Sequence, residues 1–157
     1  MQIDLFCVGK QERQFGYLVE SYSQRIQHYA KFKIHELEVK NVRDESQRQR
    51  LENEKLVKIL KKRDITPFSQ LWACDLRGKA FSSEQVADQI LQMQNSGQTL
   101  SIIVGGSRGL DDNVLGMCSQ RISFSKMTFP HQLFRVMLLE QIYRWLSIIH
   151  GTPYHKA

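Results

Sequence analysis

The sequence predicts an α/β fold with a mostly parallel sheet flanked by helices, and three observations lead to this class. Apolar segments of strand length alternate with amphipathic segments of helix length along the chain. The 157 residues, of which 41% are hydrophobic and 24% charged, are enough for one well-buried core. No repeat, low-complexity tract or linker divides them. We therefore expect a single domain over residues 1–157.

The first half of the chain is expected to begin with a strand, a helix and a second strand. Residues 2–8 end in an apolar run that meets Gly9, which is typical of a strand and its stop. Residues 15–29 carry one apolar stripe at helical spacing. The stripe consists of Leu18, Tyr22, Ile26 and Tyr29. Residues 33–42 alternate between polar and apolar side chains and predict the second strand.

An exposed amphipathic helix should follow, from a cap at Asp44 or Ser46 to about Arg63. Its last residues, KILKKR at 58–63, have two interpretations. Cations near a helix C-terminus are favoured by the helix dipole, whereas a lysine patch is also suited to contact phosphates. The sequence leaves both interpretations open.

The second half continues the alternation. Residues 70–76 predict a third strand that ends at the turn RGK, and Ser82 or Ser83 can cap a helix to about Asn95. Residues 100–104 predict a fourth strand. A short helix over 111–118, a fifth strand over 121–124 and a long helix from Pro130 to about Ile149 complete the pattern.

The long last helix has two apolar faces. One face consists of Leu133, Val136, Tyr143 and Leu146, and the other of Phe134, Leu138, Ile142, Trp145 and Ile149. One of them can pack on the sheet and the other on a second copy of the chain. The alternative is a helix that is simply buried on most sides.

The net charge, the cysteine content and the apolar stretches indicate the kind of partner, the metal content and the compartment to expect. The net charge of +6 and the isoelectric point near 9.3 favour an anionic partner such as nucleic acid, although a solvated basic surface has the same charge. Cys7, Cys74 and Cys118 are widely spaced and lack metal-ligand spacing, which indicates reduced thiols and no metal site. The first residues do not resemble a signal peptide, and Glu140 and Arg144 interrupt the longest apolar stretch. We expect a cytoplasmic protein without a membrane span.

The glycine-rich turn after the fourth predicted strand is the first candidate site. Its residues, Gly105-Gly106-Ser107-Arg108-Gly109, match neither the dinucleotide-binding spacing nor a P-loop. Adjacent glycines at the carboxyl end of a parallel strand still let a backbone approach a ligand closely. On its own, the turn is consistent with ligand contact and with a tight structural turn.

Two further segments are candidates. The loop from Ser123 to Phe129 alternates polar and apolar residues and can offer backbone amides and carbonyls to a flat ring. The tail GTPYHKA carries Tyr154, His155 and Lys156, which could fold over a site or fray in solvent. No acid pair, Ser-His-Asp set or metal cluster is apparent, so the sequence offers no hydrolytic machinery.

Six segments, taken in order, resemble a known family over essentially the whole chain. They are VGK at 8–10, LRGK at 76–79, IVGGSRGL at 103–110, FSKMTFPHQLFRV at 124–136, LEQIYR at 139–144 and PYHK at 153–156. In this combination they are similar to the ribosomal RNA large-subunit methyltransferase H family of the SPOUT, or α/β-knot, superfamily.

The resemblance implies a fold and an activity. Members of this family tie their C-terminal part, here about 70–157, into a trefoil knot, a topology that general folding rules would not select. They bind S-adenosylmethionine without a metal, work as homodimers, and methylate N3 of a pseudouridine in helix 69 of 23S rRNA in the large ribosomal subunit. In the family arrangement, the tail of one chain completes the site of the other.

The resemblance also implies site residues. The cofactor contacts carried over by position are Cys74, Leu76, Gly105, Gly106, Phe124, Ser125, Lys126, Met127, Thr128 and Phe129. Arg144 would stabilise the anion of the deprotonated base, His155 would accept the proton or orient the base, and Tyr154 would stack on or hydrogen-bond the nucleotide. Cys74 stands where many relatives have Leu.

Two rival functions remain at this stage. A non-catalytic RNA- or ribosome-binding module would explain the charge and the KILKKR patch equally well. A nucleotide-dependent oxidoreductase is suggested only by the strand and the glycine turn, and the turn has the wrong glycine spacing for it.

Overall fold

The protein is a three-layer α/β structure in the computed structural model, which describes residues 1–63 and 69–156. The strands are β1 (Gln2–Val8), β2 (Lys31–Leu37), β3 (Ser69–Ala80), β4 (Thr99–Val104) and β5 (Gln120–Ser123). The helices are α1 (Gly16–Gln27), α2 (Glu45–Lys62), α3 (Ser83–Asn95), α4 (Asp112–Met117) and α5 (His131–Ile149), with a 3-10 turn, η1, over Arg13–Phe15. The strands lie in the order β2-β1-β4-β3-β5, and each described pairing is parallel, as expected.

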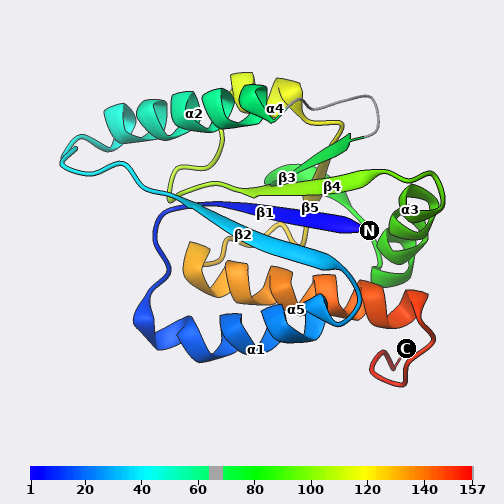
Figure 1. Cartoon of the computed structure of the whole chain (residues 1–157). Helices are drawn as coiled ribbons and strands as arrows, with labels where there is room; N and C mark the ends of the chain where they lie inside the picture. The colour runs from blue at the N-terminus through cyan, green and yellow to red at the C-terminus, as the bar shows by residue number, and fades with distance from the viewer. Residues whose placement is uncertain (64–68, 157) are drawn as a thin grey trace.

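Helices cover both faces of the sheet (Figure 1). One face packs on α1, α3 and α5 and the other on α2 and α4. Because successive strand residues point to opposite faces, Leu5 and Cys7 of β1 enter the first core while Phe6 and Val8 enter the second. This burial on both sides explains why β1 and β4, which lie inside the sheet, are largely apolar along their length.

The second strand lies earlier than predicted. Its prediction over 33–42 is wrong at both ends, because β2 runs from Lys31 to Leu37. Pairing with β1 sets these limits, since Gln2 is opposite Lys31 and Val8 is opposite Leu37. The alternation beyond Leu37 has no partner strand because β1 ends at Val8, and the amide of the next residue, Gly9, donates to the Leu37 carbonyl.

The third strand is longer than predicted. The sequence suggested a stop at Leu76 before the turn RGK, but β3 continues to Ala80. Cys74 and Lys79 both pair with Ile122, so the intervening residues form an irregular bulge inside the strand. A Cβ on Gly78 would lie 2.7 Å from the backbone carbonyl carbon of Ile122. The glycine therefore permits a close approach of two strands and does not end one of them.

Most helix boundaries agree with the prediction to within a few residues. Asp44 caps α2 by accepting from the Gln47 amide, and Ser82 caps α3 in a reciprocal capping box with Gln85. The last helix, α5, begins directly after Pro130. It is flanked by α1 and α3, and much of both apolar faces expected on it packs within the chain, although Leu133 of the first face remains 40% exposed.

The single-domain assignment of 1–157 and the trefoil knot over about 70–157 both stay predictions. Within the described part of the chain, no helix is long and apolar enough to cross a membrane.

Candidate active site

A cavity of about 430 Å³ opens where β3, β4 and β5 end at their carboxyl edge, the edge at which parallel sheets place ligands. Nine of the ten residues expected to contact a cofactor line this cavity. They are Cys74, Leu76, Gly105, Gly106, Phe124, Ser125, Met127, Thr128 and Phe129. Lys126 is the exception, because its side chain is exposed and does not line the cavity. Segments that are distant in the sequence thus line one cavity.

The glycine turn closes tightly on itself. The Gly109 amide donates to the Gly106 carbonyl at 3.0 Å, and Gly109 has a φ of 73°, a conformation that favours glycine. A Cβ on Gly105 would lie 2.9 Å from the Gly109 backbone, and one on Gly106 would lie 3.0 Å from Glu52 Oε2 and 3.2 Å from Val8 Cγ1. The space that side chains at Gly105 and Gly106 would need is therefore already occupied by the turn itself and by α2.

This geometry corrects the sequence-based explanation of the two glycines. Their backbone lines the cavity, but a Cβ on Gly105 would collide with the Gly109 backbone, and one on Gly106 would press on the side chains of Glu52 and Val8. Gly105 and Gly106 therefore shape the cavity wall by allowing the turn to fold. The geometry supports the structural turn, and ligand contact by the turn stays a prediction.

The loop after β5 forms the opposite wall. The Ser123 hydroxyl donates to the Ser125 carbonyl at 2.9 Å, and the Ser125 hydroxyl accepts from the Met127 amide at 3.0 Å. The Phe124 ring lies 4.8 Å from the Phe134 ring on α5. These contacts fix the loop, whereas Met127 is 73% exposed at the cavity rim. The cavity therefore offers apolar surface beside backbone polar groups.

Eleven further residues line the cavity, among them Asp75, His131 and Phe134. His131 and Phe134 belong to a segment that carried the resemblance. Asp75 lies in β3 between Cys74 and Leu76, two predicted cofactor contacts, and so within the stretch that the resemblance indicated. Its Oδ2 is buried and has no hydrogen-bond partner in the described structure, because the Arg77 guanidinium approaches only to 3.6 Å. A carboxylate oxygen of this kind is expected to have a partner in the working protein.

The three predicted catalytic residues lie together at the other end of α5. Arg144 donates to both carboxylate oxygens of Glu140, and the Tyr154 hydroxyl donates to Glu140 Oε1 at 2.9 Å. His155 places Nδ1 3.3 Å from Arg144 Nη1 and Nε2 2.7 Å from Glu84 Oε1. The tail is thus folded back on α5 and on the first turn of α3.

The pairing in this cluster shifts several pKa values. The hydrogen bond with Glu140 raises the pKa of Arg144, so the guanidinium stays charged. Burial, followed by hydrogen bonds with Tyr22 and Glu140, raises the pKa of Tyr154. Bonds from its own backbone amide, from Ser82 and from His155 lower the pKa of Glu84 to about 2. Glu84 is therefore an anion at neutral pH and a fixed acceptor for His155.

The catalytic cluster and the cavity are far apart within one chain. His131 lines the cavity at the start of α5 and Arg144 lies near its end, which separates them by roughly 20 Å along the helix axis. One chain therefore does not bring its own Arg144 to the ligand cavity.

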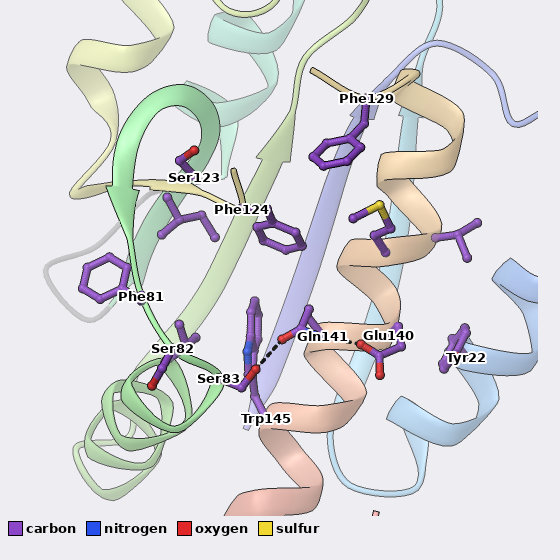
Figure 2. A pocket seen from close by; sticks show the side chains of 14 residues that line it. Tyr22, Phe81, Ser82, Ser83, Ser123, Phe124, Phe129, Glu140, Gln141 and Trp145 are labelled. Carbon is purple, nitrogen blue, oxygen red and sulfur yellow. Dashed lines mark hydrogen bonds between the residues drawn. The ribbon is translucent and has the colours of Figure 1, made fainter. Parts of the chain in front are cut away.

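A second cavity of about 470 Å³ lies over α5, between Tyr22 of α1 and the start of α3 (Figure 2). Trp145, Phe81 and Phe124 give it aromatic walls, and the Ser83 hydroxyl donates to Gln141 Oε1 at 2.8 Å on its rim. Phe124 and Phe129 line both cavities. The two cavities are therefore adjacent on one side of the molecule.

No group of three or more metal-ligating side chains occurs in residues 1–63 and 69–156. Cys7, Cys74 and Cys118 are free thiols, and burial raises the pKa of all three, that of Cys7 to about 12.

Comparison with known proteins agrees with this geometry. A family model described as "Predicted SPOUT methyltransferase" matches residues 1–155. A curated relative from Clostridium botulinum (strain Okra / Type B1), named ribosomal RNA large subunit methyltransferase H, is 42% identical over 99% of this chain and 100% of its own length.

Solved structures share the fold at low sequence identity. A probable methylase family protein from Haemophilus influenzae aligns with 99% of this chain and 70% of its own, with a TM-score of 0.58 and 10% identity. The SpoU methyltransferase AviRb from Streptomyces viridochromogenes, solved with AdoMet, aligns with 91% of this chain and 57% of its own, with a TM-score of 0.50 and 10% identity. The chain belongs to the SPOUT methyltransferase family.

Proposed function

We propose that the protein transfers a methyl group from S-adenosylmethionine to N3 of a pseudouridine in helix 69 of 23S rRNA, within the large subunit or the assembled ribosome, in the cytoplasm. The observation that carries the proposal is the cavity at the carboxyl edge of the sheet, where nine of the ten residues expected for the cofactor converge. The name of the Clostridium relative supports the substrate class.

The residues of the cavity fit the proposed donor. Its volume lies within the roughly 300–1,000 Å³ typical of small-molecule sites. Phe124, Phe129 and Phe134 offer apolar surface for a purine ring, while the glycine turn offers backbone groups. The Asp75 carboxylate pairs with Arg77 at 3.6 Å, but its buried Oδ2 has no hydrogen-bond partner in the described residues and is suited to accept from ribose hydroxyls or from an ammonium group. When bound, the donor supplies a methyl group on a good leaving group, so the protein mainly has to position the acceptor and stabilise charge.

The C-terminal cluster would act on the acceptor base. Arg144 is held by Glu140 and carries a permanent charge that can stabilise an anion at the pseudouridine ring. Since a guanidinium only donates, Nδ1 of His155 accepts from Arg144, and Nε2–H donates to Glu84. With both ring nitrogens engaged, His155 offers the base only the face of its ring in this arrangement, and proton acceptance at Nδ1 would need Arg144 to move away. Tyr154 adds a ring for stacking.

A homodimer would bring the two parts together. Because Arg144 lies roughly 20 Å along α5 from the cavity of its own chain, it can act only at the cavity of another chain. The aromatic groove over α5 and the exposed Leu133 offer the surface for a second copy. An isologous arrangement of two antiparallel α5 helices would set each C-terminal cluster beside the partner's cofactor cavity.

The test is methylation of ribosomes that lack the modification. The protein is incubated with such ribosomes and labelled donor, and the rRNA is digested and examined by mass spectrometry. We expect one methyl group on N3 of the helix 69 pseudouridine. RNA binding without binding of S-adenosylhomocysteine and without methyl transfer would instead favour a module that binds RNA without catalysis. Sedimentation at micromolar concentration checks the dimer, and a monomer would contradict the shared site.

A further inference from the structure

The loop between β1 and η1, residues 9–12, is anchored by more buried polar groups than a surface loop ordinarily has. Arg135 and Gln132 project from the first turns of α5 and are 1% and 5% exposed. Arg135 donates from Nη2 to the Gly9 carbonyl at 2.9 Å, and Gln132 donates to the Lys10 carbonyl at 2.8 Å. The Glu12 amide donates back to Gln132 Oε1 at 3.1 Å.

A carboxylate completes the anchorage. The Gln11 amide donates to Glu36 Oε1 at 2.8 Å, and the same oxygen accepts from Arg135 Nη1 at 2.8 Å. Four consecutive residues therefore each have a backbone group held by a side chain from β2 or α5. Burying an arginine and an amide costs desolvation free energy, which these bonds offset only if the loop stays in place. The loop is a rigid part of the surface.

This rigid loop lies next to the proposed active site. A Cβ built on Gly9 would lie 4.0 Å from Nε2 of His131, and His131 lines the cofactor cavity. Val8, which precedes the loop, lies behind Gly106 of the cavity wall. The loop presents Lys10 and Arg13, both exposed, and neither side chain has a hydrogen-bond or ion-pair partner in the described residues.

Other cations surround the same cavity. Arg77 and Arg108 line it, and Lys126 projects from the loop that forms its far wall. Arg77 and Arg108 have partners in Asp75 and Ser46, but Lys126 has none among residues 1–63 and 69–156. The rim therefore carries positive charge on several sides of the cavity mouth.

The KILKKR segment lies at the opposite end of the sheet. The N-terminal half of α2 contacts the glycine turn through Gln49 and Arg108, so the helix runs away from the cavity (Figure 1). Lys58, Lys61 and Lys62 are exposed at its far end. Arg63 is instead used within the fold, since it pairs with Asp4 at 3.2 Å and lies 4.9 Å from the Phe6 ring centroid.

We propose that the anchored loop at residues 9–12 is an RNA-docking element, in which Lys10, with Arg13 beside it, binds a phosphate of the RNA that flanks the target nucleotide. This inference rests on the proposed function and assigns the RNA to the cavity rim instead of the KILKKR segment. A phosphate contact positions the strand without reading its sequence. A loop that cannot move makes that contact without an ordering cost, and the target base then enters the cavity in a defined register.

The test compares two sets of exposed lysines by RNA binding without a methyl donor. The probe is a hairpin RNA with the sequence and pseudouridines of helix 69, and its affinity is measured by fluorescence anisotropy at several salt concentrations. For Lys10→Gln we expect binding weakened about threefold to tenfold near 0.1 M salt, and a salt slope reduced by about one. The triple variant Lys58→Gln/Lys61→Gln/Lys62→Gln is the matched control and should bind like the parent protein.

The outcomes distinguish a failure of the docking proposal from a failure of the proposed function. Calorimetric titration with S-adenosylhomocysteine should give the same affinity for the parent protein and for Lys10→Gln, because Lys10 does not line the cavity. Unchanged RNA binding by Lys10→Gln would overturn the proposal, as would a loss confined to the triple variant. A parent protein that binds the hairpin through Lys10 but transfers no methyl group to ribosomes that lack the modification would contradict the proposed function and leave the docking loop standing.

Discussion

The two ends of α5 are built on different principles. At its N-terminal end, the cofactor cavity is made of backbone turns and apolar side chains that are fixed by close approach. At its C-terminal end, Arg144, Tyr154 and His155 form a cluster of charged and polar side chains fixed by hydrogen bonds to Glu140 and Glu84. The first end offers apolar surface and backbone groups to a flat ligand, with Asp75, Arg77 and Arg108 also in its lining, whereas the second suits the stabilisation of charge.

This difference predicts that damage at the two ends will separate binding from turnover. A change in the cavity should remove cofactor affinity, whereas a change in the cluster should lower the rate at normal cofactor affinity. The four predictions that follow test this separation, from the largest expected effect to the smallest.

Gly105→Val should abolish binding of S-adenosylhomocysteine and also lower the melting temperature. The new side chain would meet the Gly109 backbone, and overpacking of this kind costs about 1–3 kcal/mol. Calorimetry and thermal unfolding measure the two effects. Gly116→Ala is the matched control, because a Cβ on Gly116 meets nothing within 4 Å and that residue lies in α4. A Gly105→Val protein with parental stability would contradict the steric explanation.

Arg144→Ala should reduce the methylation rate about a hundredfold to a thousandfold, the usual effect of removing one group that stabilises an anion. Its affinity for S-adenosylhomocysteine should stay at the parental value, since Arg144 does not line the cavity. Single-turnover kinetics and calorimetry measure both quantities. Arg50→Ala, which removes an exposed arginine of α2, is the control. Loss of cofactor affinity in Arg144→Ala would erase the distinction between the two ends.

Asp75→Asn should weaken S-adenosylhomocysteine binding about tenfold, because the charged acceptor at the cavity wall becomes a neutral amide. The substitution conserves shape, so the fold should be unaffected. Asp88→Asn, at an exposed position of α3, supplies the control in the same titration. Equal affinities for the two variants would show that Asp75 has no role in the cavity.

Glu84→Gln should have the smallest effect, and the effect should depend on pH. The pKa of Glu84 is lowered from 4.5 to about 2 in the fold, so its ionised form stabilises the protein above pH 4.5. That contribution disappears as the pH falls from about 5 towards 2. Melting temperatures of the two proteins should therefore differ at pH 7 and converge near pH 2. A difference that persists at low pH would argue against the bonds from Ser82 and His155.

Much of the fold follows from local patterns. The capping residues Asp44 and Ser82, the apolar runs of β1 and β4, and the start of α5 after Pro130 were all readable from the sequence, because each depends on neighbours within a few residues. The errors in β2 and β3 have another origin. The limits of β2 are set by pairing with β1, and those of β3 by pairing with β5. Neither pairing can be predicted from the residues of one segment alone.

The candidate site shows the same division. By itself, the sequence determined the α/β class, the helix caps and, through its resemblance to a family, which residues to expect around a cofactor. Only the tertiary structure decided that Asp75 Oδ2 is buried without a hydrogen-bond partner in the described residues, that Gly105 packs against the backbone of its own turn, and that Arg144 lies far from the cavity in its own chain. The reason is physical: propensity and capping act over a few residues, whereas cavities, close approaches and distances along a helix depend on segments that meet only after the chain has folded.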